Sequence, residues 1–188
     1  KWYQMGSLFP FSRSHCHIDY HRKEPFKMGT LLLETTKKSL KFRYSILKYY
    51  YSLFMLTKGT GTLFRPLFFE FSNDLDTLTD SVIDNFFMIG DALLAIPDFN
   101  EGYSEETNGY FPQGNWFDLR NYSQVKNEDS VNPQYVKIKT NLREMPAVYL
   151  RAGKTIFMNN VEGVMNSYDL NSEYKLVIAL QNNKGVYD

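Results

Sequence analysis

The side chains most able to do chemistry lie in a polar segment near the start of the chain. Arg13 and His15 come directly after residues 7–12, a short and mostly apolar run. An imidazole can hydrogen-bond a hydroxyl group, and a guanidinium can pair with a carboxylate or a phosphate. Parallel α/β barrels place residues that bind sugars or phosphates at the carboxyl tips of their strands. We therefore predict that residues 7–12 form a strand and that Arg13 and His15 are binding residues at its tip.

The same segment offers a metal site as an alternative. His15 and His17 would point to one face of an extended backbone, as in some zinc sites, and only His21 or Asp19 could complete the set. Cys16 is the single cysteine, which excludes an internal disulfide and any site built from several thiolates. We favour structural roles for His17 and His21, and we predict no metal and no other cofactor.

Composition excludes several classes of partner. The 188 residues carry 21 basic and 21 acidic side chains, so no global field attracts nucleic acid or an anionic membrane. No run approaches the roughly 18 apolar residues of a membrane span. Asp19 and Glu24 are candidate acids, but nothing marks the pair of carboxylates that glycoside chemistry requires. We predict no nucleic-acid partner and no membrane. The chain starts without Met, inside an element, so we expect it to be part of a longer protein.

The elements that must position the binding residues follow along the chain. Residues 13–29 form a predicted loop, in which Pro25 and Gly29 act as breakers. A helix is predicted from Thr30 to Lys58 and is ended by Gly59 and Gly61. The helical spacing places five side chains on one face: Leu40, Tyr44, Leu47, Tyr51 and Phe54.

After Gly61 the pattern changes from helical to extended. Residues 63–71 read as a strand and Asn73-Asp74 as a turn. Eight short apolar runs follow, at residues 86–89, 92–96, 109–112, 116–119, 135–139, 147–151, 155–158 and 174–180. Many short strands separated by polar turns are typical of a β-sandwich. The predicted fold class is α/β plus all-β, with domains at residues 1–62 and 63–188.

Six motifs in order carry a resemblance to a known family. They are Trp2-Tyr3-Gln4-Met5-Gly6 with Pro10-Phe11-Ser12-Arg13-Ser14-His15, then Arg43-Tyr44-Ser45-Ile46-Leu47, Arg65-Pro66-Leu67, Phe87-Met88-Ile89-Gly90-Asp91-Ala92-Leu93-Leu94, Tyr110-Phe111-Pro112 with Trp116-Phe117-Asp118-Leu119, and Arg151-Ala152-Gly153. Together they resemble glycoside hydrolase family 31 over nearly the whole chain. The resemblance implies the final strand and helix of a TIM (β/α)8 barrel, followed by a C-terminal β-sandwich.

The resemblance also implies a retaining α-glucosidase activity. In such enzymes one aspartate attacks the anomeric carbon and a second protonates the leaving oxygen. Both aspartates lie on earlier barrel strands, so this chain carries no catalytic residue and is expected to be inactive alone. In the family, the residue at His15 binds glucose hydroxyls in the −1 subsite, and Arg13 is expected to pair with a carboxylate of the site floor.

Within the family, the loop is similar to that of the enzymes that trim N-linked glycans in the endoplasmic reticulum. The matching residues are Arg13, His15, His17, Asp19, Arg22, Glu24 and Pro25. This similarity implies a glucosylated N-glycan or another α-glucoside as substrate. It also implies a regulatory β-subunit as partner and the endoplasmic-reticulum lumen, or another secretory compartment, as location.

Two further readings of the sequence remain open beside this one. The protein could be a non-catalytic carbohydrate-binding or scaffold homologue on the same fold, or another family 31 α-glycosidase such as a lysosomal glucosidase or a xylosidase. In the β-region, Trp116 is a candidate for a secondary glycan contact, against a purely structural role. Asn121-Tyr122-Ser123 is an N-glycosylation sequon and makes Asn121 a candidate modification site.

Overall fold

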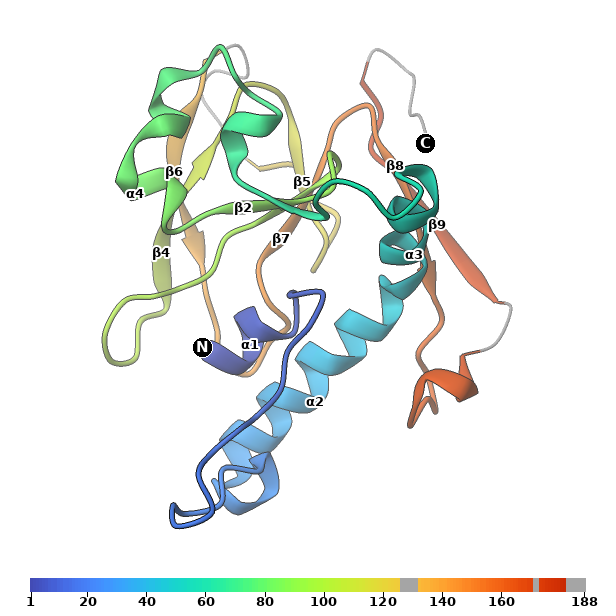
Figure 1. Cartoon of the computed structure of the whole chain (residues 1–188). Coiled ribbons are helices and arrows are strands. Elements are labelled where there is room, and N and C mark those ends of the chain that lie inside the picture. Colours follow the sequence, from blue (N-terminus) through green and yellow to red (C-terminus); the bar gives the residue numbers. More distant parts are fainter. Residues whose placement is uncertain (126–131, 171–172, 182–188) are drawn as a thin grey trace.

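A five-stranded antiparallel sheet forms the middle layer of the molecule (Figure 1). The computed structural model describes residues 1–125, 132–170 and 173–181. The strand order of the sheet is β1-β2-β3-β7-β5, and β4–β6 and β8–β9 form two-stranded antiparallel sheets. The strand bounds are β1 Phe64–Arg65, β2 Phe87–Ile89, β3 Leu93–Ala95, β4 Glu106–Phe111, β5 Trp116–Asp118, β6 Gln134–Lys139, β7 Val148–Arg151, β8 Thr155–Asn159 and β9 Tyr174–Ile178.

The helices lie mainly in the first third of the chain. The α-helices are α1 Trp2–Gly6, α2 Thr30–Ser45, α3 Leu47–Leu56 and α4 Asp80–Ile83. Single turns of 3₁₀-helix form at Pro25–Lys27, Leu67–Phe69, Leu75–Leu78 and Ser167–Asp169. Figure 1 shows α2 and α3 running diagonally past one side of the strands.

The central sheet is apolar on both faces, which explains the continuous apolar runs in its strands. Side chains alternate between faces along a strand, so Phe87 and Ile89 join one core while Met88, between them, joins the other. The same sorting divides Leu93 from Leu94 on β3. Each of these strands is therefore buried along its whole length.

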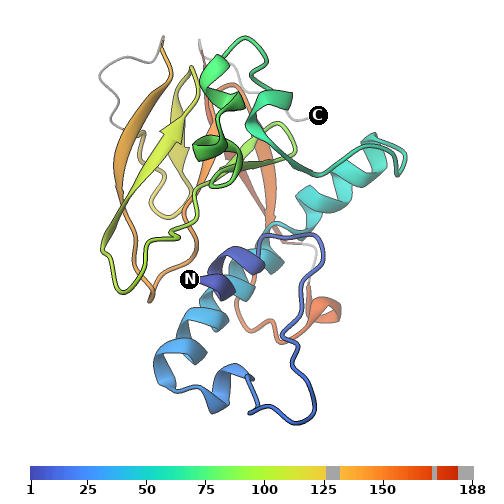
Figure 2. The same cartoon turned by 60° about the vertical axis from the view of Figure 1, so that its left-hand side comes forward.

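One face of the sheet packs against β4 and β6, which completes a sandwich (Figure 2). Trp116 lies in this core with no exposed surface, and its indole N–H donates to the Pro112 carbonyl at 2.9 Å. This burial excludes the alternative of a secondary glycan contact through Trp116 and agrees with a structural role. The indole is a core residue whose polar atom is already satisfied.

The other face of the sheet packs against the helices. Tyr49 on α3 donates a hydrogen bond from its hydroxyl to the Ile89 carbonyl at 2.9 Å and accepts one from the Ala92 amide at 3.3 Å. Burial and, secondarily, the nearby Asp91 carboxylate raise the pKa of this phenol, so it remains a protonated donor. The helix is thereby fixed to β2 and to the turn that follows it.

The predicted helix over residues 30–58 is present but is interrupted at Ile46, where φ is −100° and ψ is 7°. Gly59 follows its end at a positive φ of 75°, and its amide donates to the Phe54 carbonyl, as predicted for a glycine-terminated helix. The face that the helical spacing marked is not the face that packs against the sheet. Tyr51 and Phe54 are exposed, and the buried side chains are instead Phe42, Ile46, Tyr49, Tyr50 and Leu53.

Two predicted strands are shorter or absent, whereas all eight apolar runs after residue 85 contain a strand. Residues 7–11 form turns and bends, and no strand in the described residues pairs with residues 7–12. The Leu8 and Phe9 amides donate to the Met5 and Gly6 carbonyls, and the carbonyls of residues 7–10 accept from side chains. In the segment 63–71, only Phe64–Arg65 is a strand. Pro66 lacks an amide N–H and starts a 3₁₀ turn. The helices share one core with the sheet, so the division at residues 62 and 63 stays a prediction.

Gly90, in the turn between β2 and β3, provides a test of the helix–sheet contact. Its φ is +60°, and a Cβ there would meet both terminal carbons of Leu53 at 2.8 Å. Gly90→Ala should lower the free energy of unfolding by about 2–4 kcal/mol, from overpacking and backbone strain together. Thermal or denaturant unfolding of the complete polypeptide measures it.

Gly102→Ala is the matched control. Its φ is +71°, but nothing lies within 4 Å of the added Cβ, so only the strain of about 1 kcal/mol applies. Equal effects of the two variants would show that Gly90 makes no close contact with α3.

Candidate functional site

The four carbonyls of residues 7–10 are held in turn by side chains from the helices. Arg43 on α2 donates from its guanidinium to the carbonyls of residues 7, 9 and 10. Its Nη1 lies 2.9 Å from the Ser7 oxygen, and its Nη2 lies 2.8 Å from the Pro10 oxygen. Tyr50 on α3 donates its hydroxyl hydrogen to the Leu8 carbonyl. These bonds take the place of the ladder that a strand would form.

The energetic weight of this arrangement comes from burial. Ser7 and Leu8 are buried, and a buried carbonyl without a partner destabilises a fold by about 1–3 kcal/mol. Burial raises the pKa of the Tyr50 phenol, although the nearby Arg43 charge acts in the opposite direction. The phenol therefore keeps its proton at neutral pH and remains a donor.

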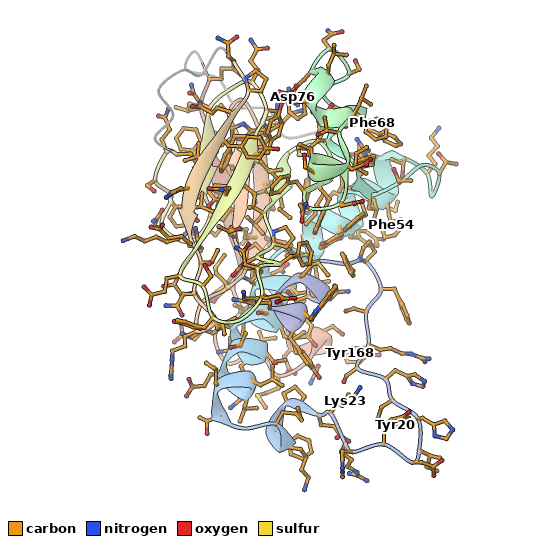
Figure 3. The ribbon with its side chains drawn as sticks, turned by 90° about the vertical axis from the view of Figure 1, so that its left-hand side faces the viewer. Tyr20, Lys23, Phe54, Phe68, Asp76 and Tyr168 are labelled. Carbon is orange, nitrogen blue, oxygen red and sulfur yellow. The ribbon has the colours of Figure 1, made fainter. Side chains whose placement is uncertain are left out.

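Beyond residue 12 the chain forms an exposed loop that runs beside α2 towards the N-terminal end of that helix (Figure 2). Tyr3 on α1 closes the base of this loop. Its hydroxyl lies 2.9 Å from the Ser14 hydroxyl and donates to the Lys23 carbonyl at 2.7 Å. Figure 3 shows Tyr20 and Lys23 well away from the sheets.

Arg13 and His15, the two predicted binding residues, are both exposed in this loop. Neither side chain forms a hydrogen bond, an ion pair or a ring contact with any other residue that the structure describes, and they do not contact each other. The carboxylate expected to pair with Arg13 is thus not found in the described part of the chain. Both side chains are therefore available to bind a group that does not belong to the described part of the chain.

The other loop residues pair among themselves. His17 Nδ1 lies 3.1 Å from an Asp19 oxygen and also accepts the Asp19 amide hydrogen at 3.3 Å. Arg22 lies 3.7 Å from Glu24, and this distance is long and Arg22 is exposed, so the pair adds little stability although Glu24 is half-buried. Among residues 1–125, 132–170 and 173–181, no three His, Cys, Asp or Glu side chains gather as metal ligands.

A large groove lies elsewhere, between α2, the turn after β5, β6 and the β8–β9 hairpin. It has a volume of about 1580 Å³, and neither Arg13 nor His15 lines it. The buried Asp118 carboxylate forms a 2.6 Å ion pair with Arg120 on its wall, and Arg120 also donates to the Lys139 carbonyl and to the Tyr149 hydroxyl. With its donors bonded to the protein, Arg120 connects β5, β6 and β7 and is a structural residue.

Sequence reasoning missed the residues that position the loop. Arg43, Tyr50 and Tyr3 were assigned no role, although Arg43 and Tyr3 stand inside the motifs that carry the family resemblance. The available signal was an Arg beside apolar helix positions, where an unpaired charge would be costly.

Comparison with known proteins agrees with this architecture. Residues 1–53 match the glycosyl hydrolases family 31 TIM-barrel domain, and residues 60–156 match the glycosyl hydrolase family 31 C-terminal domain. The second match covers more than half of the chain, so the protein belongs to glycoside hydrolase family 31. The predicted fold class, the end of a TIM barrel followed by a C-terminal sandwich, is thereby confirmed.

Individual relatives in this family are α-glucosidases. The lysosomal acid alpha-glucosidase of Tetrahymena pyriformis is 34% identical over 96% of this chain and 20% of its own length. The glucosidase II alpha subunit in its alpha3-Glc2-bound form has a TM-score of 0.82 at 26% identity, over 95% of this chain and 19% of that one. An ER glucosidase II complex, of the catalytic subunit with the binding domain of the regulatory subunit, has a TM-score of 0.73 at 26% identity, over 85% and 17%.

The chain spans about a fifth of the length of the proteins it resembles. In the part of the chain that the structure describes, no helix is long and apolar enough to cross a membrane.

The Arg43 contacts predict a specific change in backbone dynamics. In the complete polypeptide, Arg43→Ala should speed hydrogen–deuterium exchange at residues 8–16, because three carbonyls lose their donor at once. Arg143→Ala is the matched control, since Arg143 is exposed and lies 3.5 Å from Glu34 at the surface. Unchanged exchange in the Arg43 variant would show that the guanidinium does not fix the loop.

Proposed function

We propose that this chain is the C-terminal part of the catalytic region of a longer retaining α-glucosidase. The single observation behind the proposal is the consecutive match to the barrel domain and the C-terminal domain of family 31. The barrel match covers only residues 1–53, which leaves most of a barrel to be supplied by sequence outside the chain. The sandwich then serves as a support packed against the barrel.

In this proposal, His15 and Arg13 act on the substrate or on the site and not on the reacting bond. The nucleophile and the acid–base aspartate belong to the missing part, and residues 1–188 alone are inactive. His15 hydrogen-bonds glucose hydroxyls in the −1 subsite, and Arg13 pairs with a carboxylate of the site floor. The support is geometric, because both side chains are exposed and unpaired at the end of a segment anchored by Arg43 and Tyr50.

The finer proposal is trimming of glucosylated N-glycans in the endoplasmic reticulum. It rests on the likeness to the glucosidase II alpha subunit, which extends over 95% of the chain, and on the loop motif around His15. A regulatory β-subunit is the proposed partner, by analogy with the heterodimeric complex that the chain resembles. The protein would then reside in the lumen of a secretory compartment.

A lysosomal α-glucosidase is the second candidate, and one observation favours it. The Tetrahymena pyriformis lysosomal enzyme is 34% identical over nearly the whole chain. The two candidates share the reaction and differ in substrate and in working pH. A substrate panel measured at neutral and at acidic pH separates them.

The proposed activity predicts that the complete polypeptide hydrolyses terminal α-glucosides with retention of anomeric configuration. NMR of the first product should show the α-anomer of glucose before mutarotation. A β-glucoside serves as the control and should remain intact. Binding of α-glucosides without turnover, and without the two upstream aspartates, would instead establish the non-catalytic scaffold.

The role of His15 predicts a selective loss of catalytic efficiency. In the complete enzyme, His15→Ala should lower kcat/KM roughly 5- to 150-fold, because one or two lost hydrogen bonds to sugar hydroxyls remove about 1–3 kcal/mol of transition-state binding. His21→Ala, in the same exposed loop, is the control and should leave kcat/KM unchanged. An equal kcat/KM for the His15 variant and the wild type would remove His15 from the subsite.

A further inference from the structure

The turn that follows β5 carries the one N-glycosylation sequon in the sequence, Asn121-Tyr122-Ser123. All three residues are exposed. The turn is closed by the Tyr122 amide, which donates to the Asp118 carbonyl at 2.7 Å, and Tyr122 adopts a positive φ of 60°. The sequon therefore stands at the surface on a tight and well-defined turn.

Within this turn the asparagine and the serine are hydrogen-bonded to each other. Asn121 Oδ1 accepts the Ser123 amide hydrogen at 2.9 Å and the Ser123 hydroxyl hydrogen at 2.7 Å. In the described part of the chain, no protein group accepts a hydrogen bond from Asn121 Nδ2. The atom that would receive a sugar is therefore not committed to the fold.

Another exposed asparagine, in a similar turn, shows that turn geometry alone does not make an asparagine available to accept a sugar. Asn160 is also exposed, and its Oδ1 accepts the Glu162 amide hydrogen at 3.1 Å. Its Nδ2, however, donates to a Glu173 carboxylate oxygen at 3.2 Å, and residue 162 offers no hydroxyl. Only the turn at Asn121 combines surface exposure, an uncommitted amide nitrogen and a hydroxyl two residues later.

We propose that Asn121 is a site of N-linked glycosylation. The donor is an oligosaccharide carried on a lipid diphosphate. Asn121 Nδ2 forms a bond to the anomeric carbon of the first sugar, the bond from that carbon to the diphosphate oxygen breaks, and Nδ2 loses one proton. The lipid diphosphate leaves with the bonding electron pair.

The folded structure accommodates the product. Asn121 is exposed and lines the groove beside the β8–β9 hairpin, and no residue of the loop 13–24 lines that groove. Tyr122 ties the turn to β9, because Lys175 Nζ donates to its hydroxyl at 2.6 Å and lies 4.0 Å from its ring centroid. A glycan at Asn121 would extend over the rim of this groove and leave the hydrophobic cores untouched.

The inference rests on the proposed function only in so far as that function routes the protein through the secretory pathway. The test therefore supplies the route independently. The complete polypeptide is expressed in eukaryotic cells behind a cleavable heterologous signal peptide, and the purified protein is treated with peptide-N-glycosidase in heavy-oxygen water. Trypsin then releases residues 121–126 for mass spectrometry, since Arg120 and Lys126 flank this peptide.

We expect most molecules to yield the heavy-oxygen aspartate at position 121. Ser123→Thr should keep the modification, and Ser123→Ala and Asn121→Gln should abolish it with unchanged kcat/KM. An unmodified peptide from the secreted wild-type protein would overturn the proposal whatever the enzymatic activity. If the wild-type protein carries the glycan but does not cleave α-glucosides, the site stands and the proposed function fails.

Discussion

The structure depends on one set of hydrogen bonds, those from Arg43 and Tyr50 to the consecutive carbonyls of residues 7–10. The Ser7 and Leu8 carbonyls lie in buried residues and must be satisfied, and no neighbouring strand in the described residues bonds to them or to the carbonyls of residues 9 and 10. Two side chains supply the donors instead. The direction in which the chain leaves residue 10, and so the place where Arg13 and His15 emerge, is set by the helices.

The same helices are fixed to the sandwich by the residue beside Tyr50. The Tyr49 hydroxyl donates to the Ile89 carbonyl and accepts a hydrogen bond from the Ala92 amide. The Tyr50 hydroxyl donates to the Leu8 carbonyl, in the segment of residues 7–10. Two adjacent phenols thus connect the loop to the central sheet through a single turn of α3. Through this contact the sandwich holds the helix that orients the loop.

The sequence predicted the strands well and the helix faces poorly, and the reason is physical. A strand such as Leu93–Ala95 is buried on both faces, so its apolar run is unambiguous without knowledge of its neighbours. Tyr51 and Phe54 are apolar at helical spacing and yet exposed, because the face that a helix buries depends on what packs against it.

The candidate site could be located from sequence but not built from it. Arg13 and His15 were marked by their residue types and by the family motif, and the structure places both at the surface of one loop. Their support by Arg43, Tyr50 and Tyr3 could not be predicted, because it involves contacts from a helix to a loop some 30 to 40 positions earlier and from α1 to both arms of that loop. Trp116 shows the opposite case, in which a residue type suggestive of sugar binding belongs to the core.

The most direct measurement is a crystal structure of the complete polypeptide with a glucose-containing ligand in the barrel. The account predicts a ring nitrogen of His15 within about 2.7–3.2 Å of a sugar hydroxyl oxygen, while the Arg43 guanidinium still bonds the backbone before the loop. An imidazole turned into the protein away from the sugar, or a guanidinium released from those carbonyls, would contradict it.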